Sequence, residues 1–177
     1  RALFEAPTLA AFARRVEEAL RGGETGVPPL RPASREGELP LSFAQERLWF
    51  LDQLEPGSSV YNVPAAVRLR GDLDVAALGR ALGEIIQRHE VLRTTFAAVR
   101  GRPVQVVAPS GAAALPLDDL TGLYPEDRDA AVLARVRAIA DVPFDLAKGP
   151  LLRAKLLRLA PVDHVFVMCM HHVVSDA

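Results

Sequence analysis

The sequence contains very little cysteine and no long apolar run. Its 177 residues include one cysteine, Cys169, so a disulfide within the chain is excluded. Disulfides are rare in reducing compartments, and we therefore expect a cytoplasmic protein. No uninterrupted apolar stretch approaches the roughly 20 residues that a membrane-spanning helix needs. No membrane partner is expected.

An excess of charge of one sign is also lacking. Lysine and arginine total 21 and aspartate and glutamate total 22, for a net charge of -1. A basic surface for nucleic acid is therefore not expected. The sequence has no zinc-ligand spacing and no Gly-x-Ser-x-Gly nucleophile elbow, so we expect no metal site and no covalent acyl-enzyme. An initiator methionine and a signal peptide are absent too, and we expect a piece of a longer polypeptide.

Composition divides the chain into three parts. Residues 1–21 contain an amphipathic helix over 8–20, for which Thr8 is the expected N-cap. Residues 22–38 are rich in glycine, proline and charge, which is typical of a linker. Residues 39–177 carry alternating helix and strand patterns, and we expect them to form a separate folded part.

The third part begins with a capping box and contains several expected elements. Ser42 and Gln45 have the spacing of the box, which predicts a helix to about Leu54. Helices are also expected after Asp74 and from Pro125. The apolar patterns predict a half-buried strand at 63–69, a hairpin of 93–99 with 103–108, a short strand at 115–117, and an antiparallel pair at 151–159 and 165–172.

Two adjacent histidines, His171 and His172, follow the buried apolar run from Val165 to Met170. The alternation of a strand places His172 on the face of Phe166 and His171 on the opposite face. Histidine titrates near neutral pH, so the pair is a candidate for proton transfer. The alternative is two hydrogen-bonded core histidines, and the pattern of residues leaves both possibilities open.

Three stretches resemble the core motifs of the condensation domains of nonribosomal peptide synthetases. They are LSFAQERLWFL at 41–51, RHEVLRTTF at 88–96 and MHHVVSDA at 170–177, and their order and separations are also similar to those of the family. The resemblance implies an α+β fold in the form of an α/β two-layer sandwich. This would be one chloramphenicol acetyltransferase-like lobe, with a mixed sheet packed by helices. It further implies that residues 39–177 are the N-terminal lobe, that the C-terminal lobe is missing, and that residues 1–21 are the last helix of a peptidyl carrier domain.

The implied reaction is amide formation between a donor acyl or peptidyl thioester and an acceptor aminoacyl thioester. Phosphopantetheine arms deliver both substrates, and no cofactor is expected to bind the domain directly. The implied partners are upstream and downstream peptidyl carrier domains, an adjacent adenylation domain and the C-terminal lobe. Without that lobe we expect the chain alone to be inactive and to expose apolar surface.

The resemblance also suggests roles for individual residues. His172 would be catalytic, as a general base or as a hydrogen-bonding partner of the amine, and His171 would pack and position it. Asp176 would support the site through a buried ion pair with Arg93 or Arg88, whose rupture would cost about 3–5 kcal/mol. Ala177 stands where the family pattern has glycine.

Three alternatives to condensation remain open. An epimerisation domain would use the same histidine motif to abstract a proton at Cα. A docking domain of the same fold would recruit other proteins without catalysis, and a stand-alone acyltransferase would have no carrier helix. Ser42 could be a nucleophile, but helix capping already accounts for it.

Overall fold

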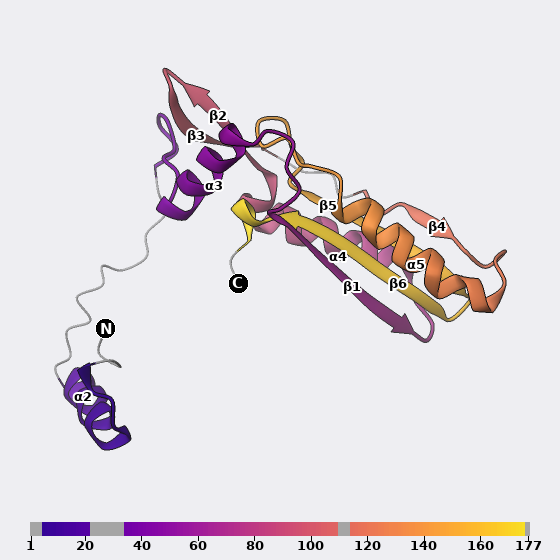
Figure 1. The fold of residues 1–177 in the computed structure, drawn as a ribbon, viewed down its shortest axis with the longest axis horizontal. Helices are drawn as coiled ribbons and strands as arrows, with labels where there is room; N and C mark the ends of the chain where they lie inside the picture. The colour runs from indigo at the N-terminus through magenta and orange to yellow at the C-terminus, as the bar shows by residue number, and fades with distance from the viewer. Residues whose placement is uncertain (1–4, 22–33, 110–113, 176–177) are drawn as a thin grey trace. The chain divides into compact units, whose positions relative to one another are not determined.

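The computed structural model describes residues 5–21, 34–109 and 114–175. The chain divides into two units, Arg1–Glu36 and Gly37–Ala177. In the first unit, α2 spans Leu9–Arg21 (Figure 1). The Thr8 hydroxyl accepts a hydrogen bond from the Ala11 N–H at 3.3 Å, as expected of an N-cap. That α2 comes from a carrier domain stays a prediction.

The second unit alternates helices and strands (Figure 1). Its helices have a cap or a first-turn proline at their start, as the sequence predicts. The α-helices are α3 (Phe43–Leu54), α4 (Val75–Arg88) and α5 (Pro125–Ala140). The strands are β1 (Asn62–Arg70), β2 (Thr94–Val99), β3 (Arg102–Val107), β4 (Leu117–Asp119), β5 (Leu152–Ala160) and β6 (Asp163–His171), and the short 3-10 helices are η1 (Glu90–Arg93) and η2 (His172–Val174).

The described strands form a mixed sheet and a separate hairpin. In the sheet the order is β1-β6-β5-β4, and β2 pairs with β3 alone. The β1–β6 and β5–β6 pairs are antiparallel, whereas β4 and β5 are parallel. The predicted α+β class, with a mixed sheet packed by helices, is confirmed. The hairpin and the antiparallel pair that ends the chain are confirmed as well.

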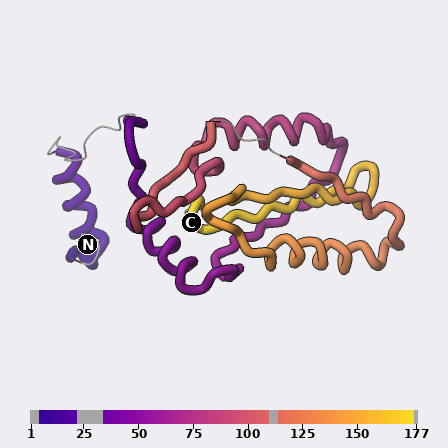
Figure 2. Tube along the Cα trace, turned by 90° about the horizontal axis from the view of Figure 1, so that it is seen from above, coloured from indigo at the N-terminus to yellow at the C-terminus, as the bar shows by residue number. Residues whose placement is uncertain are grey.

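Helices lie against both faces of this sheet (Figure 2). On one face, α5 packs through Val132 and Val136 on a fully buried cluster of strand residues that includes Leu157 and Val167. On the other face lies α4, whose Leu82 and Ile86 are buried. In β6 the residues from Val165 to His171 alternate between buried and partly buried, and β5 and β6 are the two inner strands of the sheet. The end of β6 therefore lies between two hydrogen-bonded strands.

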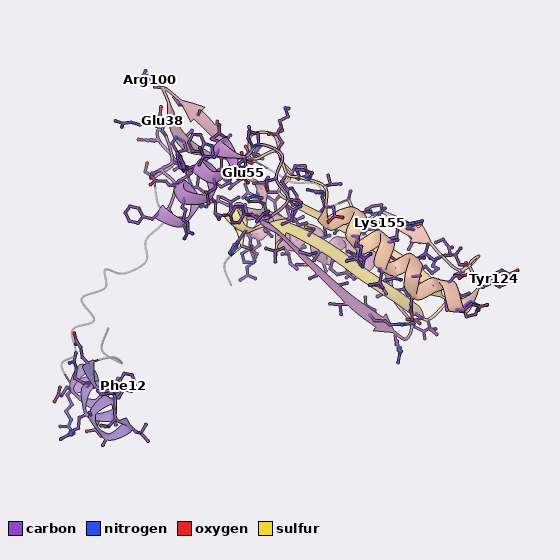
Figure 3. All side chains as sticks on the ribbon, in the orientation of Figure 1. Phe12, Glu38, Glu55, Arg100, Tyr124 and Lys155 are labelled. Carbon is purple, nitrogen blue, oxygen red and sulfur yellow. The ribbon has the colours of Figure 1, made fainter. Side chains whose placement is uncertain are left out.

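Figure 3 shows the length of the second unit from the hairpin tip at Arg100 to Tyr124, just before α5. A second apolar cluster lies at the hairpin end of the sheet, around Phe96, Phe144 and Cys169. Cys169 is buried there, as expected, with 0% of its surface exposed. The strand that leads into the two histidines thus ends inside a packed core.

Three sequence predictions need correction. Strand β1 is mostly exposed instead of half-buried: Val63 and Val67 are 40% and 54% exposed because β1 has β6 as its single neighbour in the sheet. Strand β4 begins two residues later than its predicted start at 115. Strand β6 ends at His171 and not at His172, because the chain turns there into η2.

Candidate active site

The two histidines lie where the central strand β6 gives way to the 3-10 turn η2. The N–H of His171 donates to the carbonyl of Leu151 at 3.0 Å, just before β5. The N–H of His172 donates to the carbonyl of Tyr61 at 2.8 Å, just before β1. The two neighbouring strands therefore hold successive residues from opposite sides, which fixes the direction in which each side chain leaves the backbone.

His171 is a buried ring with a defined hydrogen bond. It is 3% exposed, and its Nδ1 accepts the N–H of Val173 at 3.1 Å. An accepting Nδ1 places the proton on Nε2 in the neutral ring. Burial, with a smaller contribution from nearby His172, lowers the pKa of His171 from 6.5 to about 4. A histidine that stays neutral and buried at pH 7 is suited to positioning and not to proton transfer.

His172 has the opposite tautomer. Its Nδ1 lies 3.0 Å from the carbonyl oxygen of Ser175, and a carbonyl can only accept, so Nδ1 must donate. In the neutral ring this leaves Nε2 as the basic nitrogen. The side chain is half-buried and lines a cavity. Of the two rings, His172 therefore has the tautomer and the access that proton acceptance requires.

The cavity beside His172 has a volume of about 550 Å³. One wall is the start of α3 and the other is η2, and these two elements pack together. The lining residues are Ser42, Ala44, Gln45, Arg47, Leu48, Tyr61, Val91, His172, Val173, Val174 and Ser175. We refer to this space as the His172 cavity. Its lining comes from the first and third predicted motifs, and Val91 of the second motif also contributes.

Ser42 takes part in the capping box of α3. Its hydroxyl oxygen accepts the N–H of Gln45 at 3.2 Å, and the Gln45 side-chain oxygen accepts the N–H of Ser42 at 2.9 Å. Both groups are therefore used at the helix N-terminus. The structure supports the capping interpretation of Ser42 that the sequence favours.

The predicted supporting arginines lie outside the His172 cavity. Arg93 is 12% exposed, donates to the carbonyl of Ala108 and lies 3.7 Å from the Glu90 carboxylate. Arg88 is exposed at the end of α4. Asp176 lies outside the described residues, so its ion pair with either arginine stays a prediction. In the described part of the chain no group of three or more His, Cys, Asp or Glu side chains is arranged to hold a metal.

Three residues that sequence reasoning did not single out contact the histidine pair or its supports. The Tyr61 and Phe144 rings lie 6.2 and 6.1 Å from the His171 ring, and Phe144 meets it edge-on at 84°. The Arg153 guanidinium lies over the Phe144 ring at 3.6 Å. These contacts join segments that are far apart in the sequence, so neither periodicity nor spacing could reveal them.

Comparisons with known proteins bear on the family of this chain. The condensation-domain family model matches residues 35–177. A linear gramicidin synthase from Brevibacillus parabrevis is 48% identical over 99% of this chain, which covers 3% of that protein. A phosphinothricin tripeptide synthetase of Streptomyces viridochromogenes is 46% identical over 94% of this chain, or 15% of its own length.

Solved structures of condensation domains are also similar to this chain. The starter condensation domain of rhizomide synthetase superposes with a TM-score of 0.73 at 31% identity, over 80% of this chain and 34% of that one. The first condensation domain of the calcium-dependent antibiotic synthetase superposes with a TM-score of 0.70 at 26% identity, over 77% of this chain and 33% of that one. The chain therefore belongs to the condensation-domain family of nonribosomal peptide synthetases.

Proposed function

We propose that this chain forms one wall of a site that makes an amide bond within a nonribosomal peptide synthetase. The observation that carries the proposal is His172, with Nδ1 held by the Ser175 carbonyl and its ring lining a cavity of about 550 Å³. The substrates would be a donor acyl or peptidyl thioester and an acceptor aminoacyl thioester. Each would enter on the phosphopantetheine arm of a peptidyl carrier domain.

The reaction forms a C–N bond and breaks a C–S bond. The acceptor amine attacks the donor carbonyl, the tetrahedral species collapses, and the thiolate leaves. The amine must lose a proton, and the thiolate must gain one. The basic Nε2 of His172 can accept the amine proton or hydrogen-bond the amine during attack, and general acid–base catalysis of this kind is worth about 10²- to 10⁴-fold. His171 would hold the turn.

The comparisons support this proposal for the family of the chain, but the chain covers a small part of each relative. The relatives are synthetases many times longer than this chain, which spans 3% of one and 15% of another. A starter condensation domain 31% identical to this chain was solved in complex with C8-CoA and Leu-SNAC. Carrier domains, an adenylation domain and a C-terminal lobe as partners, and phosphopantetheine arms as substrate carriers, are part of the proposal.

The order of parts along the chain is a further proposal. The family model begins at residue 35, yet the linear gramicidin synthase aligns over 99% of this chain, which includes α2 and the following segment. This agrees with α2 as the last helix of a carrier domain. No helix in the described part of the chain is long and apolar enough to cross a membrane. A cytoplasmic location stays a prediction from the single cysteine.

The test is His172→Ala in the complete synthetase, with both carriers loaded. Dipeptidyl thioester formation should fall at least a hundredfold, because the proton acceptor is lost. Tyr124→Ala is the control: Tyr124 is 73% exposed, and the variant should form product at the wild-type rate. A His172→Ala enzyme with the wild-type rate would contradict the proposal. Solvent deuterium incorporated at Cα of a carrier-bound residue, without amide formation, would instead establish epimerisation.

A further inference from the structure

Arg153 of β5 is bound by carbonyls and an aromatic ring instead of a carboxylate. Its two terminal nitrogens donate to the carbonyls of Ile139 (3.4 Å), Val142 (2.7 Å) and Pro143 (3.1 Å). Among the described residues no acidic group forms an ion pair with it. These carbonyls belong to the end of α5 and the segment that follows. A cation at a helix C-terminus satisfies carbonyls that have no partner within the helix.

Asn62 of β1 holds the same end of α5. Its side-chain nitrogen donates to the carbonyls of Ala140 at 2.6 Å and Val142 at 2.8 Å. The Val142 carbonyl therefore receives hydrogen bonds from both side chains. β1 and β5 flank β6, and Asn62 pairs in register with His171. The end of α5 is thus tied to both strands that border the histidine strand.

This arrangement places Phe144 beside the first histidine. Phe144 is 6% exposed, the Arg153 guanidinium lies over its ring, and its ring meets His171 edge-on. His171 in turn accepts the N–H of Val173 in η2, the turn that begins with His172. A continuous series of contacts therefore runs from Arg153 through Phe144 and His171 to the turn that carries His172.

We propose that Arg153 is a positioning residue for His172, acting through Phe144 and His171. The inference rests on the proposed function, because it assumes that His172 acts in amide formation. When Arg153 is removed, the segment Val142–Phe144 loses its anchor to β5 and the His171 ring loses its packing. The turn then loosens and His172 no longer meets the amine in the productive geometry. Misplacement of reacting groups by about 1 Å can cost about 10²-fold in rate.

The experiment uses the complete synthetase with loaded carriers and follows dipeptidyl thioester formation per folded enzyme. Arg153→Gln should lower kcat by about ten- to a hundredfold, with a much smaller change in KM for the acceptor carrier. Phe144→Leu should give a similar loss, and the double variant should lose no more than the worse single one. Arg153→Lys should recover part of the rate, because an ammonium can donate to the same carbonyls. If Arg153→Gln folds poorly, the kcat of Arg153→Lys provides the test in its place.

Arg158→Gln is the matched control. Arg158 lies on the same strand, but its guanidinium pairs with Asp119 at 3.5 Å, away from the His172 cavity. This variant should keep the wild-type kcat. A common loss of kcat in both variants would attribute the effect to the strand as a whole and would overturn the inference.

The His172→Ala background separates positioning from a general structural effect. There Arg153→Gln should cause no further loss of rate, because the residue that it positions is absent. A full further loss in that background, or a kcat for Arg153→Gln within twofold of wild type, would overturn the inference. If His172→Ala itself keeps the wild-type rate, the proposed function fails. A normal Arg153→Gln enzyme beside an inactive His172→Ala enzyme rejects the positioning role alone.

Discussion

The side chain of His171 accepts a hydrogen bond from the backbone N–H of Val173, two residues further along the chain, at 3.1 Å. This bond caps the turn η2 and fixes the tautomer of His171. His172 starts the same turn and bonds through its own Nδ1 to the Ser175 carbonyl. The Nδ1 atom of buried His171 is thus a hydrogen-bond acceptor, whereas the Nδ1 atom of half-buried His172 is a donor.

Stability should depend on pH through His171. Its pKa of about 4 in the folded chain lies below the ordinary value of 6.5, so the unfolded chain binds more protons between these values. The contribution is complete above about pH 6.5 and is lost as the pH falls toward 4. Between pH 7 and pH 5 the free energy of unfolding should fall by about 2 kcal/mol from this residue. Urea denaturation at the two pH values measures it.

His171→Asn is the companion variant for this measurement. Its amide oxygen can still accept the Val173 N–H, but it does not titrate. The wild-type chain should therefore lose more stability on acidification than the variant does. Carboxylates contribute equally to both, so the difference between the two chains is the quantity to compare. Equal losses would show that His171 is not the group responsible.

Gly149 should not tolerate a side chain. Its φ is +62°, and an added Cβ would lie 2.9 Å from Cγ2 of Thr95. Gly149→Ala should therefore destabilise the chain by about 1–3 kcal/mol, from the left-handed backbone and from the clash. Thr95→Ser removes the clashing methyl group. The double variant should therefore regain the stability lost to the clash, but not the stability lost to the left-handed backbone. Thermal or urea unfolding measures both.

The control for Gly149 is Gly122→Ala. Gly122 has open space where its Cβ would lie and has no left-handed φ. Its substitution should change the free energy of unfolding by no more than about 0.5 kcal/mol. If Gly149→Ala behaves like Gly122→Ala, the close approach of Gly149 to Thr95 is not a constraint on the fold.

Ser42 should matter to stability through helix capping. Ser42→Ala removes the acceptor for the Gln45 N–H, which should cost about 1 kcal/mol. Ser42→Asn keeps an acceptor of the preferred type and should stay near the wild-type stability. Urea unfolding of the three chains distinguishes them. An alanine variant as stable as the wild type would mean that the capping box contributes nothing to α3.

Local features of the fold could be predicted from the sequence. The capping box of Ser42 and Gln45, the Asp74 cap and the proline at the start of α5 are each encoded within a few residues. The antiparallel pairing of β5 with β6 follows from two apolar runs joined by a short turn. The three motifs also pointed to the condensation-domain family, which the comparisons confirm. Short-range patterns determine such features because the interactions themselves are short-range.

The end of β6 was predicted less well for a physical reason. Strand alternation places side chains on known faces only while the strand continues, and the chain leaves the strand after His171. The exposure of β1 was also missed, because alternation does not say whether a strand has one neighbour or two. The first error lies at the end of a strand and the second at the edge of the sheet, where contacts with distant segments decide the direction and burial of side chains.

The sequence by itself determined that two adjacent histidines follow a buried apolar run in a condensation-type motif. Only the tertiary structure decided which of them is buried and neutral and which lines the His172 cavity. The Phe144 ring packs on His171, and the Tyr61 carbonyl holds the backbone of His172; both come from other segments of the chain. The tautomers are set by groups close along the chain, the Val173 N–H and the Ser175 carbonyl, but these groups reach the rings only because the chain leaves β6 and forms the turn η2.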